Sequence, residues 1–327
     1  MTRASVTCRT GDGPARQGKD GPSLRLIIIG ATGAIGSALE AAARRAGDDV
    51  VGCSRSVGGG VSFDVRTDDL AAAIPDIDAD DRVVLLAAVS DQNWVCEHPD
   101  DAREVNVGAA ARIARQADTI GCHLTVMSSE AVFGMDHDDG YRENDIPNPV
   151  TEYGRQKMEM EKTVQAHAPE AAIIRTGWNV PWTQGSRCPV RQTYDALLRD
   201  DAVMATDYFQ TVTDIDDTAS GILAAARMKH SGPLHLAAQP PIARSRLADL
   251  VIENSRHGRS MRYRAGRIAD IPFKEPRAAR ACLSGDLIRP KLGMTFRPPE
   301  ETVRLKVALL ERDRRKGTHP NDTDPAC

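Results

Sequence analysis

Short apolar runs alternate with amphipathic segments along most of the chain. The apolar runs lie at 24–29, 50–53, 61–63, 83–88, 123–127 and 171–175, and they have the length and composition of strands buried on both faces. Helices are predicted between them at about 37–46, 100–117 and 152–167. Strands that alternate with helices require crossover connections. The pattern therefore predicts an α/β fold with a doubly wound parallel sheet of the Rossmann type.

The alternation becomes looser after residue 178, where Pro181, Gly185 and Pro189 interrupt it. The elements predicted beyond this point are a helix at 191–198, a strand at 211–214, a helix at 216–228 and a strand at 234–236. We therefore predict a dinucleotide-binding domain over 24–180. A smaller substrate-binding lobe follows over 181–317, and its elements partly rejoin the sheet.

Composition excludes several classes of protein. The chain has 327 residues, with 42 Lys plus Arg against 46 Asp plus Glu, and its net charge of −4 argues against a general nucleic-acid binder. Residues 1–23 and 318–327 are poorly hydrophobic and are predicted to be disordered tails. No apolar run is long enough to cross a membrane, and residues 1–23 lack the apolar stretch of a secretory signal.

The cysteines do not predict a metal site. The chain has seven of them, an odd number, and none forms a C-x-x-C pair. A zinc site needs clustered thiolate and imidazole ligands, which this spacing does not provide. We therefore expect no metal and reduced thiols, which are typical of a cytoplasmic protein.

A glycine-rich turn joins the first predicted strand to the first predicted helix. Its spacing is G-x-x-G-x-x-G, where glycine permits a tight turn and a close approach of the backbone to a pyrophosphate. The helix behind it directs unpaired N–H groups at the phosphates. The alternative is a strand–helix turn without a ligand. The residues predicted to bind the cofactor here are Gly30, Thr32, Gly33, Ala34, Ile35 and Gly36. Ala87, Ala88 and Thr176, at the ends of two other predicted strands, are added to this set.

The end of the second strand bears on the type of cofactor. An acidic residue there would favour NAD, but the chain has Arg55 after Cys53 and Ser54. Arg55 can pair with a 2′-phosphate, so NADP(H) is predicted over NAD(H), although a solvated loop arginine is the alternative. Asp64 follows the third strand, where it can bind an adenine amino group or cap a helix that starts near Thr67.

Tyr153 and Lys157 are spaced i and i+4 on a predicted helix, so they share one face. A tyrosine hydroxyl has a reference pKa of about 10, and a nearby ammonium is expected to lower it. Such a tyrosine can donate a proton to a carbonyl oxygen as hydride arrives, while the lysine also holds the nicotinamide ribose. Because Y-x-x-x-K is common by chance, the alternative is an exposed helix pair.

Two further polar residues complete the predicted catalytic set. Ser129 follows the strand at 123–127, at the sheet edge where ligands bind, and its hydroxyl can hydrogen-bond a substrate oxygen. Asn106, on the preceding helix, can position a backbone carbonyl and a water for proton relay, and a structural role is equally compatible with its position. The predicted catalytic residues are thus Asn106, Ser129, Tyr153 and Lys157.

These motifs resemble the extended short-chain dehydrogenase/reductase family, and within it the dTDP-4-dehydrorhamnose reductase branch and its sugar nucleotide-binding relatives. The matching segments are 30–36, 105–107, 128–134, 141–149, 153–157, 175–178 and 283–287. The resemblance implies a substrate-orienting role for Ser129, an acid/base role for Tyr153 with Lys157 as its partner, and an adenine contact for Asp64. It also implies an NADPH-dependent reductase of a keto group on a nucleotide-linked sugar.

Two departures from the branch leave the substrate open. Glu130 stands where the branch has Asp, and 133–135 read Phe-Gly-Met instead of Phe-Asp-Gly. An epimerase or a dehydratase of the same family is the nearest alternative, since a dehydratase needs an added acid and base beside Ser129. A non-catalytic binding subunit on the same fold is another.

A nucleotide-sugar substrate would bring a diphosphate, which guanidinium groups bind well. The arginines available in the second half of the chain are Arg187, Arg191, Arg244, Arg246, Arg277 and Arg280. Trp178, Trp182 and Tyr208 can stack on a base or sugar, or simply pack within the lobe. Family membership also makes a homodimer possible, through the helices at about 100–117 and 152–167.

Overall fold

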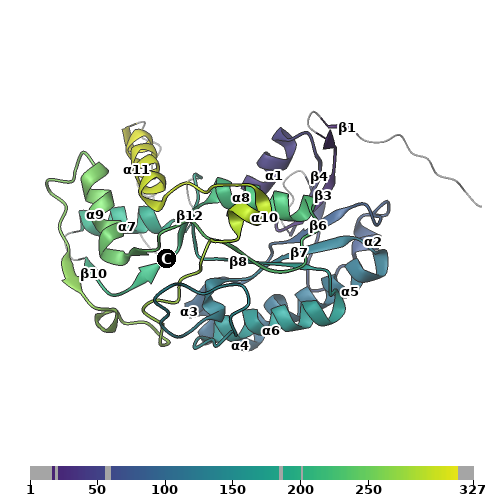
Figure 1. Cartoon of the computed structure of the whole chain (residues 1–327), viewed down its shortest axis with the longest axis horizontal. Helices are drawn as coiled ribbons and strands as arrows, with labels where there is room; N and C mark the ends of the chain where they lie inside the picture. Colours follow the sequence, from purple (N-terminus) through teal and green to yellow (C-terminus); the bar gives the residue numbers. More distant parts are fainter. Residues whose placement is uncertain (1–16, 19–20, 56–59, 184–186, 200–201, 316–327) are drawn as a thin grey trace, which may run out of the picture.

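A single parallel sheet forms the centre of the molecule (Figure 1). The computed structural model describes residues 17–18, 21–55, 60–183, 187–199 and 202–315. Within this part of the chain the sheet has seven strands in the order β13-β8-β7-β6-β3-β4-β5, and all neighbours are parallel. The strands are β3 (Arg25–Ile29), β4 (Asp49–Ser54), β5 (Val61–Ser62), β6 (Arg82–Leu85), β7 (His123–Met127), β8 (Ala172–Thr176) and β13 (Gly232–Leu236).

This strand order confirms the predicted doubly wound α/β fold. The chain winds outward in one direction from β3 to β5 and in the other from β6 to β13. The order therefore reverses between β3 and β6, which is where open α/β sheets bind ligands. The predicted strand at 234–236 is β13, which joins the sheet at its edge.

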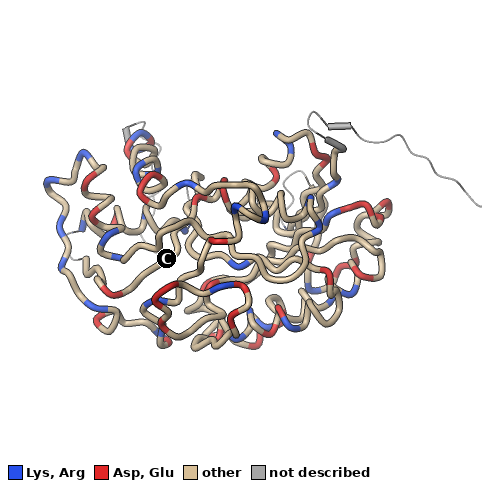
Figure 2. Tube along the Cα trace, viewed as in Figure 1, with Lys and Arg blue, Asp and Glu red and all other residues tan. Residues whose placement is uncertain are grey.

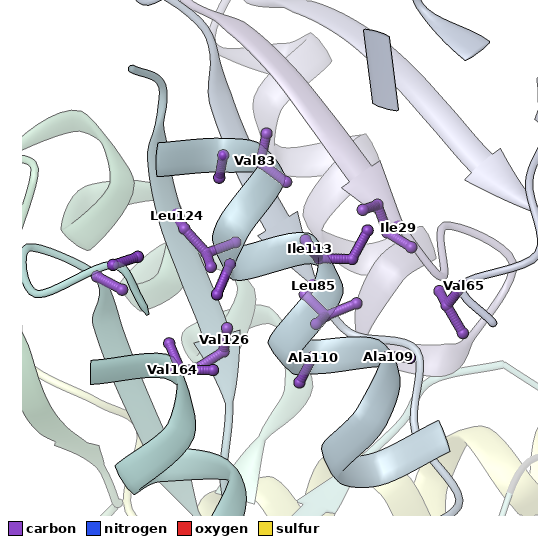
Figure 3. Packing of buried hydrophobic residues seen from close by; sticks show 14 of the residues in the cluster. Ile29, Val65, Val83, Leu85, Ala109, Ala110, Ile113, Leu124, Val126 and Val164 are labelled. Carbon is purple, nitrogen blue, oxygen red and sulfur yellow. The ribbon is translucent and has the colours of Figure 1, made fainter. Parts of the chain in front are cut away.

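Helices cover both faces of the sheet because successive strand residues point to opposite sides. On one side Ile27 and Ile29 pack with residues of α5 (Ala110–Ile120) and α6 (Glu152–His167). Figure 3 shows this core, with Ile113 of α5 and Val164 of α6 beside strand residues. On the other side Leu26 and Ile28 pack with α1 (Ala34–Arg45) and α8 (Ile215–Arg227).

Two helices of the dinucleotide-binding half differ most from their predicted bounds. Helix α1 begins at Ala34 with Gly33 as its N-cap, three residues before the predicted start, so its first turn lies inside the glycine motif. The helix predicted over 100–117 consists of α4 (Pro99–Arg103), a π-helical turn η1 (Glu104–Ala109) and α5. A π-turn inserts one residue into the helical spacing, and such turns occur frequently at functional sites.

The second half of the chain builds a separate hydrophobic core. It lies among α7 (Pro189–Leu198), α9 (Arg244–Asn254) and α11 (Pro299–Arg315), with Tyr194, Val251 and Val307 at its centre. Short strands pair around it: β9 (Trp178–Val180) with β12 (Val212–Asp214), β10 (Val203–Ala205) with β15 (Arg264–Gly266), and β11 (Phe209–Gln210) with β14 (Ile242–Ala243).

The remaining elements are short. They are β1 (Gln17–Gly18), β2 (Gly21–Pro22), α2 (Leu70–Ala73), α3 (Gln92–Glu97), η2 (Glu130–Val132), η3 (Ile268–Asp270) and α10 (Ile288–Leu292). The pair β1–β2 falls in the segment predicted as an N-terminal tail, whereas residues 1–16 and 318–327 and Gly185 lie outside the described residues. Among the helices of the described chain, none combines the length and apolar character needed to cross a membrane.

Charged residues lie mostly on helices and loops, and the strands of the central sheet are largely uncharged (Figure 2). The exceptions are Arg25, Asp49, Arg82 and Arg175. Arg175 in β8 is the most deeply buried of them, with a side chain only 3% exposed. A buried charge needs a partner, and Arg175 forms an ion pair with Glu161 of α6.

Candidate active site

The glycine motif forms a cradle between β3 and α1. Gly30 has φ +97°, a conformation that other residues rarely adopt, and a Cβ there would lie 2.8 Å from the Ala87 nitrogen. A Cβ at Gly36 would lie 2.2 Å from the Gly30 oxygen, so only glycine lets α1 approach the strand this closely. The first N–H groups of α1, at Ala34, Ile35 and Gly36, have no partner within the helix. This cradle fits a pyrophosphate.

Two hollows meet at the cradle. One has a volume of about 820 Å³ and is lined by Thr32, Arg55, Asp64, Arg66 and Ala87 among others. The second, of about 600 Å³, reaches the ends of β7 and β8. Both are lined by Gly30, Gly33, Leu86 and Ala88. Together they form a cleft across the carboxyl edge of the sheet, with room for one half of a dinucleotide on each side of the glycine turn.

On the β4 side of the cleft, Asp64 is held by Arg66. The Arg66 guanidinium lies 2.6 Å from the Asp64 carboxylate, and the Arg66 backbone N–H donates to it at 3.0 Å. The side-chain hydrogen bond from Arg66 holds the pKa of Asp64 at about 2. Asp64 thus stabilises a turn, while α2 begins at Leu70 with Asp69 as its cap rather than near Thr67. Arg55 lines the same hollow.

The predicted catalytic residues Ser129, Tyr153 and Lys157 come together in the 600 Å³ hollow, which Thr176 also lines. The Tyr153 hydroxyl lies near enough to Ser129 for that side chain to favour the phenolate, and the Lys157 ammonium lies 5.8 Å from the centre of the Tyr153 ring. Lys157 Nζ also donates to the Met127 backbone oxygen at 2.9 Å. Tyr153 and Lys157 are 7% and 4% exposed, so the Y-x-x-x-K motif is not a solvated surface pair.

Burial sets the charge states of this pair. It raises the pKa of Tyr153 to about 12, against a smaller opposite effect of the Ser129 hydrogen bond. It lowers the pKa of Lys157 to about 8, against the raising effect of the Glu161 carboxylate. The sequence predicted a lowered tyrosine pKa, but desolvation of the buried phenol dominates. At neutral pH the phenol therefore keeps its proton while the ammonium is mostly charged.

A buried ion pair lies under the catalytic residues and was not predicted. Arg175 of β8 donates to Glu161 of α6 through Nε at 2.9 Å and Nη2 at 2.7 Å. Ser128 donates to the same carboxylate at 2.5 Å, so of two adjacent serines Ser128 faces the ion pair while Ser129 faces Tyr153. The available signal was an arginine inside an apolar strand, which demands a buried partner.

Asn106 lies in the π-turn η1, and its polar atoms are engaged within the fold. Its Oδ1 accepts from the Val89 N–H at 2.9 Å, and its Nδ2 donates to the Val89 oxygen at 3.1 Å and to Gln156 Oε1 at 3.0 Å. These bonds fix the loop after β6 against α6. The side chain is 2% exposed and does not line either hollow, so its part in proton relay stays a prediction.

The candidate phosphate-binding arginines fall into two groups. Four have carboxylate partners, at Asp91 for Arg187, Asp195 for Arg191, Glu253 for Arg246 and Asp138 for Arg280. For Arg244 and Arg277 the described part of the chain shows no ion pair to a carboxylate, and their guanidinium groups stack on Trp178 and Phe273. Arg277 and Arg187 line the cleft.

The three aromatic residues predicted to stack on a base or sugar lie in different places. Trp178 lines the cleft. The Trp182 indole instead donates to Asp214 at 3.0 Å and lies beneath Lys306, so it packs within the second lobe. Tyr208 is 6% exposed and lines a small pocket beside the cleft.

Known proteins resemble this chain in sequence over most of its length. The family model described as the RmlD substrate binding domain matches residues 24–311. The dTDP-4-dehydrorhamnose reductase of Mycobacterium tuberculosis is 30% identical over 275 residues, which cover 81% of this chain and 86% of that protein. Methionine adenosyltransferase 2 subunit beta of Bos taurus is 35% identical over 156 residues, and this match spans only about half of each protein, 47% of the chain and 46% of the relative.

Solved structures share the fold at low sequence identity. A dTDP-4-dehydrorhamnose reductase from Clostridium acetobutylicum superposes with a TM-score of 0.78 at 20% identity, covering 88% of this chain and 100% of that one. The Bacillus anthracis reductase in complex with NADP gives 0.76 at 17% identity, covering 88% and 99%. MoeE5 in complex with UDP-glucose and NAD gives 0.76 at 19% identity, covering 89% and 99%.

The family model and the reductase from Mycobacterium tuberculosis each match more than two thirds of the chain, in agreement with the motifs recognised in the sequence. The chain therefore belongs to the RmlD substrate binding domain family, in the dTDP-4-dehydrorhamnose reductase branch of the extended short-chain dehydrogenases/reductases.

Proposed function

We propose that this chain is a nicotinamide-dependent oxidoreductase that reduces a keto group on a nucleotide-linked sugar. The observation that carries the proposal is the meeting of Ser129, Tyr153 and Lys157 in a cleft that continues past the glycine cradle. The names of the related reductases supply the substrate class, a nucleotide-linked keto sugar.

Each of the three side chains has a distinct task in this reaction. The Ser129 hydroxyl donates to the carbonyl oxygen of the substrate and holds it beside the Tyr153 phenol. Tyr153, whose pKa burial raises to about 12, is neutral and donates its proton to that oxygen. The Lys157 ammonium, anchored by Met127, stabilises the phenolate that this leaves behind. A bound nicotinamide would supply the hydride.

We further propose that the cofactor is NADP(H). The end of β4 presents Arg55 and no carboxylate, and Arg66 lies on the rim of the same hollow. Structural neighbours bind NADP in one case and NAD in another, so they support a nicotinamide cofactor without selecting between the two. Replacing Arg55 by Ala should weaken NADPH binding by about 10- to 100-fold, the value of a charge-assisted hydrogen bond, and leave NADH unchanged. Equal effects on both cofactors would contradict the preference.

The remaining assignments concern the two halves of the cofactor and the second lobe. Asp64 and Ala87 would contact the adenosine half of the cofactor, and Thr176 the nicotinamide half, because they line the corresponding hollows. A diphosphate-binding role for the arginines, a proton-relay role for Asn106, a homodimer and a cytoplasmic location stay predictions.

The function can be tested by turnover of a defined substrate. The full chain is incubated with NADPH and dTDP-4-dehydrorhamnose, and loss of the reduced nicotinamide is followed by absorbance. The proposal predicts that one NADPH is consumed for each sugar reduced. A sugar converted without net consumption of NADPH would instead indicate an epimerase or a dehydratase, for which Glu130 beside Ser129 would be the candidate extra acid.

A second candidate function is a non-catalytic binding subunit. The partial match to methionine adenosyltransferase 2 subunit beta favours it, because that protein carries "subunit" in its name. This candidate predicts tight binding of NADPH or a nucleotide sugar with no hydride transfer to any keto sugar. The assembled Ser129, Tyr153 and Lys157 set makes the enzyme the stronger proposal.

A further inference from the structure

A small pocket of about 60 Å³ adjoins the catalytic cleft. It lies between η2, the start of α6, β11 and the segment around Arg277. It shares four lining residues with the 600 Å³ hollow of the cleft: Gln92, Glu130, Trp178 and Arg277. Because Glu130 directly follows Ser129, the pocket lies one residue away from the group proposed to hold the carbonyl oxygen.

Three residues that line this pocket carry buried polar atoms without a hydrogen-bond partner in the described part of the chain. They are Glu130 Oε2, Gln210 Oε1 and Arg277 Nε. Buried polar atoms in native proteins are nearly always paired, with protein groups, water or ligand. Three unpaired atoms around one pocket therefore indicate that something polar fills it.

The rest of these side chains is fixed in place. Gln210 is 5% exposed, and its Nε2 donates to the Phe209 oxygen at 2.9 Å. Burial raises the pKa of Tyr208 against the opposite effect of the nearby Arg277 and Gln210 side chains, and the Arg277 guanidinium stacks 4.5 Å from the centre of the Phe273 ring. These contacts hold the Gln210 and Arg277 side chains in position at the pocket.

The chemistry of the three atoms selects the kind of partner. Gln210 Oε1 can only accept a hydrogen bond and Arg277 Nε can only donate one. Burial raises the pKa of Glu130 to about 8, so this carboxyl is mostly protonated at neutral pH and can do either. Hydroxyl groups, which both donate and accept, can pair with all three atoms. A fully ionised phosphate offers no donor and would leave Gln210 Oε1 unpaired.

The volume agrees with a small polar group. A cavity needs roughly 10–15 Å³ for each water-sized occupant, so this pocket of about 60 Å³ holds about four to six. That is enough for two adjacent hydroxyl groups at one edge of a sugar ring, and too little for a nucleobase.

We propose that Glu130, Gln210 and Arg277 form a hydroxyl subsite that binds the hydroxyl-bearing edge of the sugar ring next to the reacting carbonyl carbon. The subsite rests on the proposed function, because it assigns part of the substrate of that same cleft. It makes the neighbouring ring hydroxyls determinants of specificity.

Binding measurements on the full chain test the subsite without requiring turnover. In the presence of NADP⁺, dTDP-rhamnose and UDP-glucose are titrated by calorimetry, each beside its 2-deoxy and 3-deoxy analogues. Loss of a hydroxyl that pairs with the subsite should weaken binding by about 10- to 100-fold, since it leaves a buried polar atom unpaired. Gln210→Met should weaken binding of the parent sugar by a similar factor and leave the affinity for the sensitive deoxy analogue unchanged.

Thr302→Val is the matched control. Thr302 lies in α11, away from the cleft, and its Oγ1 is also buried without a partner, so the variant removes an unpaired atom outside the subsite. It should retain the full discrimination between parent and deoxy sugars. The wild-type comparison decides the matter even if Gln210→Met does not fold.

The outcomes separate the two proposals. Equal affinities for parent and deoxy sugars would overturn the subsite and leave the proposed function intact. Discrimination in a protein that never reduces a keto sugar would overturn the reductase and keep the subsite. Failure of the wild-type chain to bind any of these nucleotide sugars would overturn both.

Discussion

The buried ion pair between Arg175 and Glu161 should contribute strongly to the stability of the fold. Their side chains are 3% and 6% exposed, and two of the three hydrogen bonds to the Glu161 carboxylate come from Arg175. Arg175→Met would leave the buried Glu161 carboxylate with Ser128 as its hydrogen-bond donor and without the guanidinium charge. Removing one member of a buried pair costs about 3–5 kcal/mol, so the free energy of unfolding should fall by that amount.

This loss is large beside a total stability of about 5–15 kcal/mol for a typical protein. Urea unfolding at neutral pH, followed by far-ultraviolet circular dichroism, would measure it. The double variant Arg175→Met with Glu161→Met should be more stable than the single variant, because it removes both members of the ion pair. Arg44→Met is the surface control: its partner is Glu40, their side chains are 55% and 32% exposed, and the cost should be about 0–1 kcal/mol.

Two results would refute this reasoning. One is an Arg175→Met variant that unfolds within about 1 kcal/mol of the wild type, as an exposed pair would. The other is a double variant less stable than Arg175→Met alone. Either would mean that the carboxylate is relieved by water or by rearrangement, and that packing around Arg175 matters more than its charge.

Three other predictions concern the catalytic cleft. Tyr153→Phe should lower kcat by about 10²–10⁴-fold, since it removes the proton donor, and should keep the Kd for NADPH; unchanged turnover would exclude the assigned role. Burial lowers the pKa of Lys157 to about 8, so the ammonium is lost as pH rises through that value. The kcat/KM for reduction should therefore fall over the same range. A flat profile between pH 6 and about 10 would contradict this. Burial raises the pKa of Glu130 to about 8, above its unfolded value, so its contribution to stability is complete at low pH and is lost as pH rises from about 5 through 8. Thermal unfolding across this range should therefore show a decline that is smaller in Glu130→Gln, and identical pH profiles of Tm would refute it.

The fold and the convergence of the glycine turn, Ser129, Tyr153 and Lys157 could be predicted from the sequence, because both depend on local patterns. Apolar runs separated by helical segments determine a parallel sheet, and the strand order then brings the glycine turn and Ser129 to one edge. Tyr153 and Lys157 are one helical turn apart, so their shared face follows from their spacing alone.

What the sequence did not predict depends on contacts between distant segments. The π-turn around Asn106 uses residues that also suit an ordinary helix, so no periodicity indicates it. The Tyr153 pKa is governed by the depth of burial, which the Y-x-x-x-K spacing does not reveal. Gln210 and Arg277 meet Glu130 only through the packing of the second lobe against the sheet.

Hydride transfer from a labelled cofactor tests the central claim most directly. The full chain is given NADPH carrying deuterium at the transferable C4 position together with dTDP-4-dehydrorhamnose, and the product sugar is examined by mass spectrometry and NMR. The account predicts one deuterium on the former carbonyl carbon for each NADPH consumed. Tyr153→Phe should transfer deuterium at a rate lowered as much as its kcat. A product without deuterium, or deuterium transfer by Tyr153→Phe at the wild-type rate, would contradict it.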